Sequence, residues 1–106
     1  MGVPVPKPIY KRRVPLNSIR NKFNNATRAK IHERDDYRCV ICGWPATIIH
    51  HVMFKSQGGR GVVTNGATVC PRCHHNIHQH FELAQRLRRI YSERYGPDYY
   101  KDVYDD

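Results

Sequence analysis

Two cysteine pairs constrain the fold of this chain more than any other feature of its sequence. Cys39 and Cys42 form one C-x-x-C pair, and Cys70 and Cys73 form a second pair after 27 intervening residues. One such pair presents two thiolates to a metal ion, and two pairs complete the tetrahedron that Zn²⁺ prefers. A chain of 106 residues has a small core that such a site would stabilise. The sequence therefore predicts a structural zinc site. The alternatives are two disulfides in a secreted scaffold, or a site in which a histidine replaces one cysteine.

The N-terminal sequence favours the zinc site over the disulfides. Residues 1–15 contain prolines and charges where a signal peptide would have an apolar segment. No run approaches the roughly 18 apolar residues that span a membrane. We therefore expect a cytoplasmic protein without a membrane partner, whose thiols stay reduced and available to metal.

The positive charge is concentrated near the N-terminus. The chain has a formal charge of +9, and residues 1–34 alone contribute +8, from nine basic side chains and one acidic one. A basic arm on a nearly neutral body is typical of proteins that bind polyanions. Charge alone leaves RNA, DNA, anionic lipid and a merely solubilising role open. Within the arm, Lys11, Arg12 and Arg13 are candidate nucleic-acid contacts.

Composition divides the chain into three parts. Residues 1–25 form a basic, proline-containing arm that we expect to be extended, because proline disfavours continuous helix. Residues 26–96 form the folded domain. Residues 97–106 form an acidic, tyrosine-rich tail to which the sequence assigns no task.

Local patterns within the domain predict a helix, a ββα unit and a final helix. Asn24 or Asn25 can cap the first helix, Pro71 suits the first turn of the second, and Gly96-Pro97 ends the third. β-Branched residues predict the two strands, and four glycines predict a loop between them. The predicted ranges are helix 26–34, strand 47–52, loop 55–66, strand 67–69, a helix from 71 through 78, and a helix from 81 or 82 to 95.

Histidines gather around this predicted ββα unit. His50 and His51 end the first strand, so their side chains point to opposite faces. His74 and His78 are four residues apart on a predicted helix, where they can chelate one ion. Asn65 follows the glycine-rich loop and could hold the two strands together or orient a histidine. The alternatives are surface histidines and an ordinary Asn-Gly turn.

The order of these motifs resembles that of the HNH family of nucleases, in the subclass with a four-cysteine zinc site. The segments HHVMFKSQGG at 50–59 and NGATVCPRCHHNIH at 65–78 carry the resemblance, which covers about residues 34–78. It implies an α+β protein with a small ββα-metal (His-Me finger) fold, flanked here by helices and an extended basic N-terminal arm.

The resemblance also implies a role for each motif residue. His51 matches the general base that activates water, and Asn65 matches the residue that positions this base. His50, His74 and His78 match ligands of one catalytic divalent ion, with His75 as the alternative to His74. Many relatives have an aspartate in place of His50, so Mn²⁺, Ni²⁺, Co²⁺ or Zn²⁺ suits the site as well as or better than Mg²⁺.

The function implied is hydrolysis of DNA to 5′-phosphate and 3′-hydroxyl ends. Lys55, Arg60 and Arg72 flank the predicted cleft and are candidate phosphate contacts. Stand-alone domains of this kind resemble those of bacteria and tailed phages, so partner proteins from genome packaging or restriction fit the prediction. The oligomeric state is not predicted. The alternative function is a zinc-stabilised nucleic-acid-binding module without catalysis, which would hold one metal ion instead of two.

Overall fold

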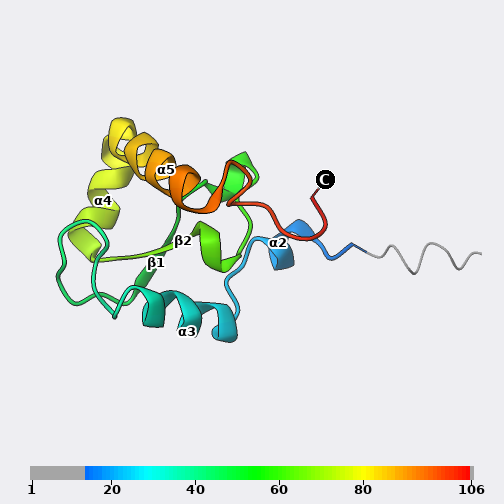
Figure 1. Cartoon of the computed structure of the whole chain (residues 1–106), viewed down its shortest axis with the longest axis horizontal. Coiled ribbons are helices and arrows are strands. Elements are labelled where there is room, and N and C mark those ends of the chain that lie inside the picture. Colours follow the sequence, from blue (N-terminus) through cyan, green and yellow to red (C-terminus); the bar gives the residue numbers. More distant parts are fainter. Residues whose placement is uncertain (1–13, 106) are drawn as a thin grey trace, which may run out of the picture.

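The computed structural model describes residues 14–105 and places a two-stranded sheet among helices. Figure 1 shows the strands at the centre, between α3 on one side and α5 on the other. In chain order the elements are α2 (Asn17–Arg20), α3 (Asn25–Arg34), β1 (Ile48–His51), the 3-10 turns η1 (Lys55–Gln57) and η2 (Val63–Asn65), β2 (Gly66–Val69), α4 (Pro71–Gln79) and α5 (Phe81–Tyr95).

The predicted ββα unit is confirmed. Strands β1 and β2 are antiparallel, and their register pairs His50 with Ala67 and His51 with Gly66. Helix α4 follows β2 directly and begins at Pro71, whose fixed φ suits the first helical position. His50 and His51, the histidine dyad, therefore lie at the loop end of the hairpin, and α4 contacts the strand that carries them.

The predicted helix limits are also confirmed. The side chain of Asn24 caps α3 by accepting a hydrogen bond from the backbone N–H of Thr27 at 2.8 Å. Helix α5 ends at Gly96, which has a positive φ of 95° that favours glycine. Helix α5 packs on α4 and buries Ala84, Leu87 and Tyr91. These side chains join Val52, Ala67, Val69 and Ile77 in the core.

Arg34 and Asp35, at the end of α3, attach this helix to the second strand. The guanidinium of Arg34 donates to the backbone oxygens of Val63 and Gly66, and the carboxylate of Asp35 accepts from the backbone N–H of Thr68. Charged hydrogen bonds of this kind are stronger than neutral ones. Arg34, which the sequence assigns to the basic N-terminal region, is thus part of the folded body.

The expectation of an extended arm up to residue 25 is wrong for residues 17–20. The chain makes one helical turn there, α2, in which the carbonyl of Leu16 accepts from the N–H groups of Ile19 and Arg20. No proline follows Pro15 in the arm, so nothing prevents a turn at this point. The boundaries after residues 25 and 96 stay predictions, although side-chain contacts cross both of them.

None of the helices within residues 14–105 is long and apolar enough to cross a membrane.

Candidate active site

The four cysteines come together as predicted. Their sulfur atoms all lie within 4.8 Å of one another, and Cys42 Sγ is 3.6 Å from Cys70 Sγ. Four sulfurs bound to one ion at about 2.3 Å would be separated by roughly 3.8 Å. The donor set therefore fits a tetrahedral metal ion, and the cysteines are free rather than joined in disulfides.

The backbone of each pair supports thiolate character. The N–H groups of Ile41 and Cys42 point at Cys39 Sγ at 3.4 and 3.5 Å, and the N–H of Cys73 points at Cys70 Sγ at 3.4 Å. Burial opposes ionisation of Cys39, but these backbone donors outweigh it and lower the pKa of this thiol to about 7. The backbone N–H of Cys73 also lowers the pKa of Cys70, whereas burial raises that of Cys73. The backbone thus favours the thiolate, the form that binds metal, at one sulfur of each pair.

His50 of β1 forms a second cluster with His74 and His78 of α4. One nitrogen of each ring lies within 4.8 Å of the others, and Nε2 of His74 is 3.2 Å from Nε2 of His78. Two nitrogens bound to one ion at about 2.1 Å are expected roughly 3 to 3.5 Å apart. The predicted ligand set is thus brought together, whereas His75 is exposed and belongs to neither cluster.

His50 provides the test of whether this cluster suits a metal. It is only 2% exposed, and its Nε2 is one of two buried side-chain polar atoms without a hydrogen-bond partner within the described residues. Burial, together with repulsion from His74 and His78, lowers the pKa of His50 to about 3. A neutral imidazole with an unused nitrogen is costly to bury, and a metal ion in the cluster would satisfy it.

His51 points to the other face and has a different partner. Its Nε2 lies 2.6 Å from the backbone oxygen of Asn21. A carbonyl oxygen only accepts, so Nε2 carries the proton and Nδ1 of the neutral ring keeps its lone pair. Nδ1 makes no hydrogen bond to any residue in 14–105. The ring of Phe23 packs against the imidazole, with ring centroids 4.2 Å apart.

Asn65 is fully buried and holds the loop that follows His51. Its Oδ1 accepts from the backbone N–H of Met53 at 2.7 Å, and its Nδ2 donates to the carbonyls of Met53 and Arg60. In addition, the backbone N–H of Val52 donates to the carbonyl of Asn65. The structure thus shows Asn65 holding backbone next to the dyad, without a bond to a histidine ring.

A pocket of about 980 Å³ connects the three-histidine cluster to His51. Its wall includes the cations Lys22, Arg28 and Lys55, of which the sequence interpretation selected only Lys55 as a contact. Phe54 also contributes, and its ring stacks on His78 with centroids 5.3 Å apart. A nucleic-acid phosphate in this pocket would meet both positive charge and imidazole nitrogens.

The other predicted phosphate contacts lie elsewhere. Arg72 is exposed on α4 and does not line the pocket. Arg60 is also outside the wall, because its guanidinium binds Asp105 and the side chains of Asn17 and Asn21. Lys11, Arg12 and Arg13 lie outside the described residues.

Sequence interpretation missed the contribution of residues 21–23. Asn21 acts through a main-chain oxygen, which every residue has, so no side-chain pattern indicates it. Phe23 carried a weak signal as an isolated apolar residue in a polar segment.

Comparison with known proteins agrees with this geometry. A family model described as HNH endonuclease matches residues 39–80, which include both cysteine pairs, the dyad, Asn65, His74 and His78. The chain is also similar to Anaredoxin from Nostoc sp. (strain PCC 7120), at 30% identity over 53 residues, 47% of this chain and 68% of that protein. The motifs, the ββα unit and the family model agree, and the chain belongs to the HNH endonuclease family.

Proposed function

We propose that this protein is a metal-dependent endonuclease that hydrolyses DNA to 5′-phosphate and 3′-hydroxyl ends. One observation carries the proposal. A three-histidine cluster and a neighbouring histidine with a free Nδ1 line the same pocket. Family membership supports a nucleic-acid substrate, and the choice of DNA belongs to the proposal.

In the proposed reaction, His51 acts as general base. The hydrogen bond from its Nε2 to the carbonyl of Asn21 leaves Nδ1 as the basic atom. This nitrogen takes the proton of the attacking water, and burial, which lowers the pKa of His51, keeps the ring neutral. Asn65 keeps the segment after the dyad in place through its bonds to Met53.

The two clusters hold two different ions in this proposal. The cysteines hold a structural Zn²⁺, and His50, His74 and His78 hold one exchangeable divalent ion. Once bound, that ion would neutralise the phosphodiester and stabilise the departing 3′ oxygen. With three imidazoles and no carboxylate, the site suits Mn²⁺, Ni²⁺, Co²⁺ or Zn²⁺ better than Mg²⁺.

Positive side chains around the pocket hold the DNA backbone. Lys55, Arg28 and Lys22 line the wall and give affinity that does not depend on sequence. Lys11, Arg12 and Arg13 extend this surface in the proposal and make binding steeply dependent on salt. A cytoplasmic location and partners from phage packaging or restriction systems also stay predictions.

A plasmid assay tests the proposal. Purified protein is incubated with supercoiled DNA and Mg²⁺, Mn²⁺, Ni²⁺ or Zn²⁺ in turn, and ligation of the products reports a 5′-phosphate. We expect cutting with at least one metal and none with His51→Ala. Intact plasmid under all conditions, combined with one tightly bound ion per chain, would instead identify a binding module without catalysis.

A further inference from the structure

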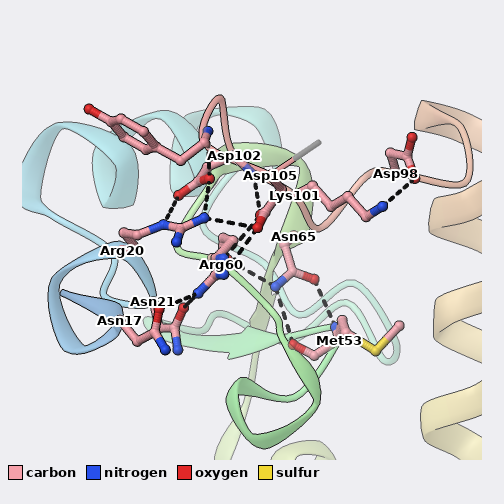
Figure 2. A network of polar contacts seen from close by, with 11 residues as sticks. Asn17, Arg20, Asn21, Met53, Arg60, Asn65, Asp98, Lys101, Asp102 and Asp105 are labelled. Atoms are coloured by element: carbon pink, nitrogen blue, oxygen red, sulfur yellow. Dashed lines mark hydrogen bonds and ion pairs between the residues drawn. The ribbon is translucent and has the colours of Figure 1, made fainter. Parts of the chain in front are cut away.

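Four charged side chains join the two ends of the described chain. Arg20 of α2 donates to both oxygens of Asp102 at 2.9 and 2.8 Å and to Asp105 at 2.8 Å. Arg60, from the glycine-rich loop, donates to both oxygens of Asp105 at 3.0 Å. Figure 2 shows these contacts converging on the acidic tail. We call Arg20, Arg60, Asp102 and Asp105 the terminal ion-pair cluster.

The cluster is shielded from water. The side chain of Arg20 is 9% exposed and that of Arg60 is 12% exposed. Hydrogen bonding to Arg20 lowers the pKa of Asp102, and hydrogen bonding to Arg60 lowers that of Asp105. Bidentate pairs in such surroundings fix geometry more tightly than exposed ion pairs do.

The cluster reaches the proposed general base through Asn21. Nη1 of Arg60 donates to Oδ1 of Asn21 at 2.8 Å, and the backbone oxygen of the same residue accepts from Nε2 of His51. Arg20, the preceding residue, is held by the tail. Members of the cluster therefore hold both Asn21, whose carbonyl accepts the His51 proton, and the residue before it.

The backbone of the glycine-rich loop also contacts residues 20–22 and holds them in place. The N–H of Gly61 donates to the carbonyl of Arg20 at 2.8 Å. A Cβ atom added at Gly61 would collide with the backbone of Lys22, so the close approach requires glycine. The segment that presents the Asn21 carbonyl thus lies directly on the loop that contains Arg60.

We propose that the terminal ion-pair cluster positions His51 for catalysis. Arg60, Asp102 and Asp105 act as positioning residues. They hold the Asn21 carbonyl against Nε2–H, which keeps Nδ1 as the basic atom of the ring. The acidic tail, to which the sequence assigns no task, acquires a positioning role through the cluster. The inference rests on the proposed function of His51 as base, whereas the hydrogen bond itself can be observed without any activity.

The test compares two variants in which different aspartates of the acidic tail are replaced by neutral asparagine. Asp102→Asn combined with Asp105→Asn removes both carboxylates of the cluster but keeps their shape. Asp98→Asn is the matched control, because it removes an exposed tail carboxylate whose ion pair within residues 14–105 is with Lys101, outside the cluster. Kinetics are measured well below the melting temperature of each variant, so that partial unfolding does not contribute.

We expect kcat of the double variant to fall about tenfold to hundredfold, as misplacing a reacting group does. KM for DNA should stay the same or fall, because the variant gains positive charge. The Nε2–H proton of His51, identified in NMR spectra by its loss in His51→Ala, should exchange rapidly with water, so that its signal disappears. Asp98→Asn should keep the wild-type kcat and the wild-type signal.

Two results would overturn the inference. One is a double variant that melts earlier but keeps both kcat and the His51 signal, which would make the cluster merely structural. The other is a fall in kcat with the signal intact, which would place the defect elsewhere. If the wild type cuts no DNA, the proposed function fails and the NMR comparison alone decides the positioning.

Arg60→Lys provides a second variant if the doubly neutralised tail does not fold. It keeps the positive charge but lacks the fork that reaches Asp105 and Asn21 together. The same loss of signal and of kcat is expected, and a wild-type signal in this variant would again overturn the inference.

Discussion

The cysteine and histidine clusters differ in how completely the protein encloses them, although α4 contributes to both. Three of the four cysteines are buried, and the sulfurs of Cys39 and Cys70 accept backbone N–H bonds that fix each pair. Among the histidines, His50 is buried, His74 is half-buried and His78 is exposed, and all three face a pocket. Four protein ligands around one ion are typical of a structural site, and three protein ligands beside an open position are typical of a catalytic one. One helix can thus serve both purposes, depending on what surrounds each end of it.

Removing a cysteine should have the largest effect, because it destroys the structural site of the two that are compared. A structural zinc site contributes roughly 10–16 kcal/mol of apparent binding energy, more than most domains have in total stability. We expect Cys73→Ser to abolish cooperative thermal unfolding, measured by circular dichroism, together with loss of the tightly bound ion. A variant that melts cooperatively without metal would show that the cluster is dispensable for folding.

Removing the proposed base should affect the reaction and leave both clusters intact. General base catalysis contributes about 10²- to 10⁴-fold in rate. We expect His51→Ala to lose at least about 10²-fold in plasmid cleavage while binding two ions and melting near the wild-type temperature. Metal content is measured by elemental analysis of the same sample, and a normal rate in this variant would eliminate His51 as base.

Removing a histidine ligand should weaken one ion only. Changes in groups that merely support a ligand cost roughly 10- to 100-fold in metal affinity, and losing the ligand itself should cost more. We expect His78→Ala to bind the exchangeable ion more weakly by calorimetry, with the tight ion retained. His75→Ala, one helical position after His74, is the matched control and should bind both ions normally. Equal effects of the two variants would contradict the proposed ligand set.

The smallest effect should come from the cations at the edge of the pocket. Lys55 lines it, whereas Arg72 lies exposed on α4 and does not. We expect Lys55→Ala to reduce the slope of log affinity against log salt by about 1, as loss of one phosphate contact does, and Arg72→Ala to change it less. Fluorescence anisotropy with a short duplex measures both slopes, and the reverse order would move the DNA path to the other side of α4.

Local patterns were sufficient to predict the ββα unit and the cysteine cluster, whereas the choice of His50 as the third histidine of the second cluster depended on the family resemblance. The spacing of Cys70, Cys73, His74 and His78 on one helix fixes their relative positions as soon as the helix is recognised. The strand register then brings His50 to the same site, since a strand and the helix after it pack together. Short-range rules were adequate because each of these relations spans a few residues or one hairpin.

The ends of the chain could not be predicted in the same way. The bond between Arg20 and Asp102 joins residues 82 positions apart, and neither residue carries a local signal for its partner. Net charge suggested that basic side chains near the N-terminus are free for DNA, but Arg20 and Arg34 are both committed to contacts within the protein. Counting charges overlooks such neutralisation, because it depends on which distant segments meet.

The sulfur of Cys70 has two roles, since it belongs to the cysteine cluster and also caps α4 by accepting the N–H of Cys73. The side chains of α4, including the imidazoles of His74 and His78, are therefore positioned by a helix that begins at that sulfur. We therefore expect an order of assembly for the two proposed ions. The ion at the cysteines should bind first, because it would fix the start of the helix that carries two ligands of the second ion. A chelator should accordingly remove the histidine-bound ion reversibly, whereas removal of the cysteine-bound ion should unfold the protein.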